Sequence, residues 1–289
     1  MSSQQQMILG TSFPSLLDAE TLRDNLRASY SGYSIESEVS NKGIYFLGSY
    51  ASTRTVTINT GEIDASSFRI WCVGAGGQTI SVWTPGYGGG GTYADHTNTG
   101  GNMVLKMGGA QGNWSGYADG YNDGDAEVAY DGYTMVAEGS GGGGTVGNFQ
   151  GSYTNNFPGT KAGGSGGTGA GSSGRGGHSQ YGGGGGAGSN GGQGLAGDGY
   201  NYGGGGGSDS GRGSNSVNGG GGSSYGYGCL GCCNGAAYYG CGATRAQGGG
   251  GSGADIVNQG SGGDALIVIQ WGSGIKSVLS SYSSGAQNF

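Results

Sequence analysis

The segment ALIVIQW at residues 265–271 is the strongest candidate β-strand in the chain and decides the fold that we expect. Its large apolar side chains occupy both faces of an extended strand, and a strand with two apolar faces belongs in the middle of a sheet. Because it lies close to the C-terminal end, it must find its neighbours far back along the chain. We therefore expect residues 265–271 to pair with strands from the N-terminal half.

Candidate partner strands lie between residues 44 and 140, where β-branched and aromatic residues alternate with polar ones. Asp131-Gly132 between two of these segments is a signal for a two-residue hairpin turn. The segments are IYFLGSY (44–50), TRTVTIN (53–59), SFRIWCVGAGG (67–77), Met103–Met107, Glu127–Tyr130 and Tyr133–Ala137. This pattern predicts a mainly β fold with little helix, built on antiparallel strands.

Glycine dominates the segment that separates these strands from the last one. The chain has 78 glycines among 289 residues but only 3 prolines, which excludes collagen. Pure glycine runs occur at 88–91, 141–144, 182–186, 203–207, 219–222 and 248–251. Such composition is typical of flexible linkers. The strands on both sides, and the varied residues between the runs, instead favour an ordered structure.

An ordered glycine run buries almost no apolar area, yet fixing its backbone costs about 1–2 kcal/mol per residue. The backbone N–H, C=O and Cα–H groups are the only partners that can offset this cost. A polyglycine II helix has three residues per turn and no internal hydrogen bonds, so its amides point outward to neighbouring helices. We therefore expect packed polyglycine II helices beside the antiparallel β-structure, together forming a glycine-rich sandwich.

One short amphipathic helix is predicted near the N-terminus. Ser15 to Asp18 follow Pro14 as a weak capping box, and Leu22 and Leu26 then lie one turn apart. The helix either packs on its own domain or docks onto a partner as an attachment segment. The expected organisation is an N-terminal segment at 1–43, a glycine-rich domain at 44–271 and a C-terminal tail at 272–289. Within that domain, 88–140 and 138–263 are rich in glycine, and 265–271 is the closing strand.

The charge and the hydropathy of the chain limit the classes of partner that we expect it to bind. A net charge of −7 and a pI near 4.6 disfavour nucleic acid, whose phosphates an acidic surface repels. No run reaches the roughly 18 apolar residues that a membrane-spanning helix needs, so no membrane insertion is expected. The start, MSSQQQMILG, has no signal-peptide pattern. We expect a protein of the virion or the extracellular space, released by lysis.

Five segments follow one another in an order that is similar to a known family: WCVGAGG, GYGGGGTYA, MVLKMGGAQG, YTMVAEGSGGGG and GGDALIVIQW. The chain resembles, over roughly residues 60–271, the glycine-rich domain of phage tail-fibre and adhesin proteins. In the tip adhesins of T-even-like phages, the similar region is a sandwich of polyglycine II helices whose end loops contact the host receptor. A related pattern occurs in some receptor tyrosine kinase ectodomains, so the resemblance implies a fold more strongly than a function. The N-terminal region does not match the fibre-attachment domain of those adhesins.

Residues suited to catalysis or metal binding are sparse. His96 and His178 both lie in polar, glycine-rich surroundings and are expected to be surface loop residues. Asp119, Asp123 and Asp125 could form a Ca²⁺ loop, but their spacing does not fit an EF-hand, and a solvated turn is the simpler interpretation. We therefore expect no enzyme activity, no cofactor and no metal.

The cysteines divide into a single residue and a cluster. Cys72 lies within a predicted strand and is expected to be a buried free thiol. The cluster comprises Cys229, Cys232, Cys233 and Cys241. Zinc sites usually show two separated ligand pairs, which this spacing fits poorly. Disulfides that staple a loop are the prediction, with zinc and free thiols as alternatives, and the pairing cannot be read from the sequence.

A tyrosine-rich surface is the candidate binding site. If successive glycine runs are antiparallel, loops 187–202 and 223–247 share one end of the sandwich, and loops 145–181 and 208–218 share the other. The first end carries Tyr200, Tyr202, Tyr225, Tyr227, Tyr238, Tyr239 and Arg245. Tyrosine supplies rigid contact area at low entropic cost, as in antibody binding loops. The alternative is that these tyrosines only cover the ends of the glycine helices.

These observations favour a virion fibre or adhesin component that binds a host surface receptor, either a protein or a glycan. Its other partners would be fibre proteins, contacted through the N-terminal region, and further copies of itself. The alternative function is purely structural: a subunit of an extracellular filament, or a virion decoration without receptor binding.

Overall fold

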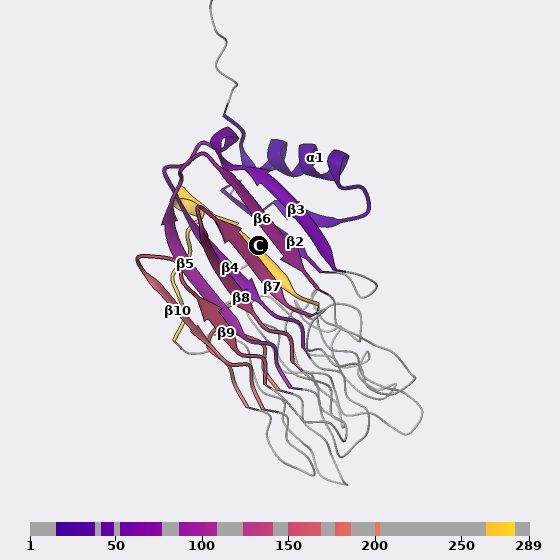
Figure 1. Cartoon of the computed structure of the whole chain (residues 1–289), viewed down its shortest axis with the longest axis vertical. Helices are drawn as coiled ribbons and strands as arrows, with labels where there is room; N and C mark the ends of the chain where they lie inside the picture. Colours follow the sequence, from indigo (N-terminus) through magenta and orange to yellow (C-terminus); the bar gives the residue numbers. More distant parts are fainter. Residues whose placement is uncertain are drawn as a thin grey trace, which may run out of the picture.

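The computed structural model of the chain describes residues 16–37, 42–48, 53–76, 87–108, 124–140, 150–168, 177–185, 200–202 and 264–280. Within these ranges, eleven β-strands form two antiparallel sheets, and one α-helix lies beside them (Figure 1). The structure is therefore mainly antiparallel β with one helix, as the sequence predicts.

The larger sheet has six strands, and the C-terminal strand lies inside it. The strands, in spatial order, are β1 (Ser34–Ser37), β2 (Gly43–Leu47), β11 (Leu266–Gln270), β4 (Ser67–Val73), β5 (Gly91–Thr97) and β10 (Lys161–Gly164). Ile267 of β11 lies opposite Phe46 on one side and Cys72 on the other. The expectation that residues 265–271 return to the N-terminal strands is confirmed.

The smaller sheet has five strands, and their order in space is the same as their order along the chain. They are β3 (Arg54–Asn59), β6 (Asn102–Met107), β7 (Ala126–Tyr130), β8 (Tyr133–Ala137) and β9 (Tyr153–Asn155). Asp131 and Gly132 join β7 to β8 with φ angles of 52° and 78°. Positive φ at both turn positions is what a type I′ hairpin requires, so the predicted hairpin is confirmed.

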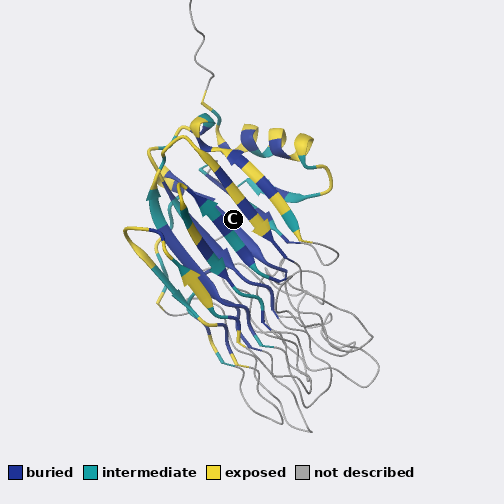
Figure 2. Ribbon diagram, in the orientation of Figure 1, coloured by how far each residue is buried: buried dark blue, intermediate teal, exposed yellow. Residues whose placement is uncertain are grey.

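The main core lies between the two sheets, because β4 and β11 contact β7 across the gap. Buried and exposed side chains alternate along β6, as in any strand with one face on a core. Met103, Leu105 and Met107 are buried, whereas Val104 and Lys106 face outward. Figure 2 shows the same contrast between dark blue core residues and yellow outer residues. Two short 3₁₀ turns, Thr60–Glu62 and Gly272–Gly274, complete the regular elements.

A second apolar cluster covers the opposite face of the six-stranded sheet. Trp71, Tyr93 and Tyr202 pack there with Leu266 and Val268. Strand β11 is consequently buried on both faces, at all five of its positions. This double burial is why its sequence reads as an uninterrupted apolar run.

Helix α1 (Ala19–Ser29) packs on the sandwich through its apolar stripe. Leu22 and Leu26 are buried, and the helix contacts β1 and β2. The capping prediction is wrong in detail: the N-cap is Asp18, whose side chain accepts a hydrogen bond from the Thr21 amide at 2.8 Å. Because β1 pairs with β2, residues 16–37 belong to the same sandwich as the strands beyond residue 43.

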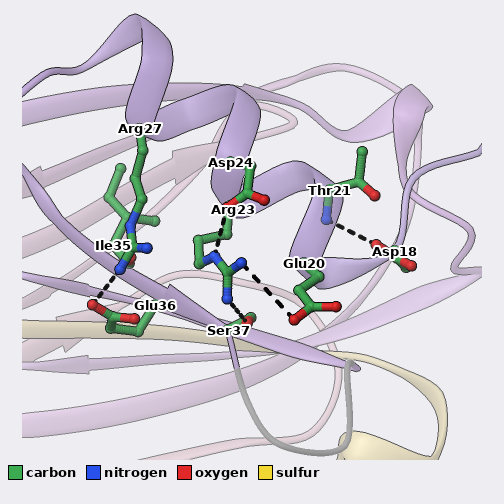
Figure 3. Close-up of polar contacts among 9 residues, drawn as sticks. All are labelled: Asp18, Glu20, Thr21, Arg23, Asp24, Arg27, Ile35, Glu36 and Ser37. Carbon is green, nitrogen blue, oxygen red and sulfur yellow. Dashed lines mark hydrogen bonds and ion pairs between the residues drawn. The ribbon is translucent and has the colours of Figure 1, made fainter.

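Side chains of α1 also bond to the outer edge of β1 (Figure 3). Arg27 Nε donates to the Ile35 carbonyl at 2.7 Å, and the same guanidinium pairs with Glu36. Arg23 donates to the Ser37 hydroxyl at 2.8 Å. The bond to Ile35 satisfies a backbone carbonyl that an edge strand would otherwise leave open.

Candidate functional site

The chain continues beyond the strand ends as extended, glycine-rich segments that run side by side (Figure 1). We call this set the glycine lattice. Its described members are residues 74–76, 87–90, 138–140, 150–152, 165–168 and 177–185. Burial continues into the lattice: Gly88–Gly90 and Gly182–Gly185 are buried although they have no side chains to pack (Figure 2).

Residues 88–90 bond to five different segments of the chain. A β-strand bonds to at most two neighbours, because its amides alternate between two directions. The five bonds are Gly88 N to Gly167 O (2.9 Å), Gly151 N to Gly88 O (3.1 Å), Gly183 N to Gly89 O (2.9 Å), Gly90 N to Glu138 O (2.9 Å) and Gly74 N to Gly90 O (2.9 Å). Consecutive peptide groups here therefore point in more than two directions.

The same glycines have no room for a side chain. A Cβ atom would lie 1.8 Å from the Gly183 carbonyl oxygen if it were added to Gly88, and 2.0 Å from that of Gly74 if added to Gly89. At Gly90 it would lie 1.9 Å from the Ser152 oxygen. The Cα–H groups point at neighbouring carbonyl oxygens, a weak contact that recurs between closely packed backbones. Glycine is therefore required by the neighbouring backbone.

Polar side chains anchor the lattice where it meets the five-stranded sheet. The Gly139 amide donates to Asp125 at 2.8 Å, and the Ser152 hydroxyl bonds to Glu138. Burial raises the pKa of Asp125 above its ordinary value. Asp125 is thus partly buried and bonded rather than in a solvated turn. No metal-binding group of three or more His, Cys, Asp or Glu side chains occurs in the described ranges, and Asp119 and Asp123 lie outside them.

His96 is not a surface loop residue, so that prediction is wrong. It lies in β5, and its side chain is only 8% exposed. Its ring contacts Tyr130, Tyr133 and Phe157 edge to face, with centroids 5.3–5.6 Å away. Strand β5 begins at the end of a glycine run. The glycine-rich composition of this region made the residues that follow look like a loop, although they form a strand. His178, in contrast, is exposed as predicted.

Two of the predicted binding tyrosines lie in the described ranges. Tyr202 is 3% exposed, packs on Trp71 at 5.1 Å and accepts a hydrogen bond from Gln270. It is therefore a core residue of the outer cluster, and we remove it from the candidate binding surface. Tyr200 is half-buried and stacks on His178 with ring centroids 5.8 Å apart.

The other predicted residues lie outside the described ranges: Tyr225, Tyr227, Tyr238, Tyr239, Arg245, Cys229, Cys232, Cys233 and Cys241. Cys72 is a buried free cysteine, as predicted, and burial raises the pKa of its thiol well above the ordinary value. Residues 145–181 do not form a single end loop, because they contain β9 and β10. That part of the predicted loop arrangement is wrong.

No protein-family profile matches the chain, and no curated protein matches it significantly. Among the described residues, no helix is long and apolar enough to cross a membrane.

Proposed function

We propose that this chain is a virion fibre component that binds a host surface receptor, with its glycine segments packed as polyglycine II helices. The proposal has two parts, a scaffold and a binding surface. The contacts of the described residues support the scaffold, and the resemblance to phage tail-fibre adhesins supports the binding surface.

The observation that carries the proposal is the bonding of residues 88–90 to five neighbours. A helix with three residues per turn and no internal hydrogen bonds directs successive amides about 120° apart, so several neighbours are reached in one turn. The absence of space for Cβ atoms at Gly88, Gly89 and Gly90 supports the same packing. Extended segments with φ near −75° and ψ near +145° are expected throughout the lattice.

A lattice of this kind suits a receptor-binding tip for a physical reason. Each segment is cross-linked to several others, so the loops that leave it start from fixed points. A binding segment whose ends are held in place has less entropy to lose when it binds a receptor. Tyrosine-rich loops on such a support would combine rigid contact area with a rigid base.

The alternative of a filament built by strand addition is less consistent with the edges of the sandwich. Arg27 occupies the Ile35 carbonyl on the edge of β1, and the Tyr30 hydroxyl accepts from the Thr57 amide on the edge of β3. At the other side, Lys161 donates to the carbonyl of Asn155, the last residue of the edge strand β9, at 3.1 Å. Side chains that occupy edge groups hinder strand-to-strand association.

The test is the location of the chain in its native assembly. Gold-labelled antibodies raised against the purified chain should decorate the fibres of phage particles in a lysate of the encoding organism, as seen by electron microscopy. The antibody should also reduce the adsorption of these particles to host cells. Antibody raised against an unrelated protein serves as the control.

Three results would count against the proposal. Label along free filaments, with none on particles, would establish the structural alternative. Label on particles without any effect on adsorption, even at saturating antibody, would make the chain a virion decoration. A high-resolution experimental structure with β dihedrals across 88–90 would reject the polyglycine II scaffold.

A further inference from the structure

His178 and Tyr200 form an aromatic pair at the surface of the lattice. His178 is exposed and Tyr200 is half-buried. Their rings stack with centroids 5.8 Å apart and planes inclined by 27°. The two residues come from separate segments of the chain, 177–185 and 200–202, so the tertiary structure alone brings them together.

Two buried polar residues hold the backbone beneath this pair. Ser179, next to His178, is 4% exposed, and its hydroxyl donates to the Ser165 carbonyl at 2.8 Å and accepts from the Gly182 amide at 2.9 Å. Asn201, next to Tyr200, is 5% exposed and donates to the Gln180 carbonyl.

The two segments are also joined directly, because the Tyr200 amide donates to the Ser179 carbonyl at 3.0 Å. Asn201 further exchanges hydrogen bonds with the backbone of Leu279 in the C-terminal tail. The main chain that carries the two rings is consequently fixed from the buried side. The entropic cost of ordering an exposed aromatic pair is thus met by the fold before any ligand binds.

We propose that His178 and Tyr200 form a subsite for a neutral hexopyranose unit of a cell-surface polysaccharide. The C–H groups on one face of a pyranose carry partial positive charge and stack on the negative face of an aromatic ring. The Tyr200 hydroxyl can exchange a hydrogen bond with a sugar hydroxyl. Ser179, Gln180 and Asn201, which adjoin the pair along the described parts of the chain, are polar and carry no formal charge, which suits a neutral sugar better than a phosphate.

The inference rests on the proposed function for the source of the glycan, the host surface, and for nothing else. Tyr200 is one of the tyrosines that the sequence predicts to bind a receptor, whereas His178 is a partner that the sequence does not indicate. Whether the pair binds sugar can be measured on the purified chain, without reference to any virion.

The experiment uses the full-length chain, fluorescently labelled, on an array of hexopyranose-containing polysaccharides from bacterial surfaces. Wild-type chain should bind a subset of them, and titration calorimetry then gives the affinity for the strongest. Tyr200→Ala and His178→Ala should each weaken binding roughly tenfold, the usual loss for one aromatic contact. Tyr200→Phe keeps the ring and should stay within about threefold of wild type.

Tyr153→Ala is the matched control, since Tyr153 is an exposed tyrosine of β9 in the five-stranded sheet, at 39% exposure, and should leave the affinity unchanged. Thermal unfolding of each variant checks that the fold is retained, and His178→Ala, which changes an exposed side chain, keeps the test valid if Tyr200→Ala unfolds.

Wild-type chain that binds no polysaccharide on the array would overturn the inference, as would alanine variants that bind like wild type. If the wild-type chain binds no sugar but the antibody labels fibres, this inference is rejected and the proposed function is retained. Sugar binding without label on any particle rejects the proposed function alone.

Discussion

At the scale of single residues, glycine in this protein is selected by its neighbours. Gly89 does not need a positive φ, yet a Cβ there would overlap the carbonyl oxygens of Gly74 and Ala75, at 2.0 and 2.6 Å. Both atoms belong to a main chain that is bonded to other segments, so neither can move without breaking further bonds. A glycine of this kind differs from a turn glycine, whose requirement lies in its own dihedral angles.

Gly89→Ala should therefore destabilise the protein by about 3 kcal/mol or more, because overpacking against a fixed backbone finds no relief. Gly101→Ala is the control: Gly101 is exposed, and its nearest neighbour would lie 3.8 Å from the new Cβ. That change should cost less than about 0.5 kcal/mol. Urea unfolding of the two variants measures the difference, and equal losses would show that residue 89 is not tightly enclosed.

Asp125 makes the stability depend on pH in a direction opposite to that of most carboxylates. Its pKa in the folded protein is raised by burial above the ordinary 3.8, so the folded state holds the proton more strongly than the unfolded state does. The charged form consequently costs stability above the folded pKa. This cost disappears as the pH falls through the folded pKa towards 3.8.

Asp125→Asn should remove that cost while keeping an oxygen that accepts from the Gly139 amide. We expect the variant to be more stable than wild type at pH 7, with the difference shrinking towards pH 4. Chemical unfolding at a series of pH values measures both curves. A variant that is less stable at pH 7 would show that the charged hydrogen bond outweighs the desolvation of the carboxylate.

At the scale of elements, α1 closes one open side of the sandwich. Its apolar stripe packs on the core through Leu22 and Leu26, and its basic side chains bond to the edge of β1. Strand β1 has only four residues, and its Ile35 carbonyl already accepts a hydrogen bond from Arg27. It is therefore a poor template for an added strand.

Arg27→Ala should lower the free energy of unfolding by about 1–2 kcal/mol, since the Ile35 carbonyl loses a charged donor. Glu36→Ala removes only the partly exposed ion pair and should cost about 0.5 kcal/mol or less. Denaturant unfolding of the two variants separates these contributions. Similar losses in both would mean that the ion pair, and not the bond to the carbonyl, holds the helix.

At the scale of the whole molecule, the same strands are stabilised by two different kinds of interaction at their two ends. The sandwich is held by an apolar core between the sheets, whereas the lattice is held by backbone hydrogen bonds. The strands β4, β5, β8 and β10 run from the first region into the second, so each region orients the other. The outer cluster around Trp71 and Tyr93 adds a second apolar layer, to which Tyr202 contributes from a distant part of the chain.

The sequence by itself determined the elements whose signals are local. The apolar run at 265–271 reveals a central strand because only a strand buried on both faces tolerates such a composition. The Asp131-Gly132 pair reveals a hairpin because few other residues adopt positive φ in succession. The Leu22–Leu26 spacing predicts the helix, and the surroundings of Cys72 predict its burial.

Only the tertiary structure decided the remainder, because glycine carries no side chain to encode its partners. Nothing in the sequence shows that residues 88–90 bond to five segments, or that β5, β9 and β10 arise within glycine-rich stretches. His96 and Tyr202 are buried by aromatic rings from strands distant in sequence, so local composition misplaces both. Burial and hydrogen bonding depend on which segments meet in space. Glycine segments have no side chains that specify their partners, so the packing of the whole chain determines which segments meet.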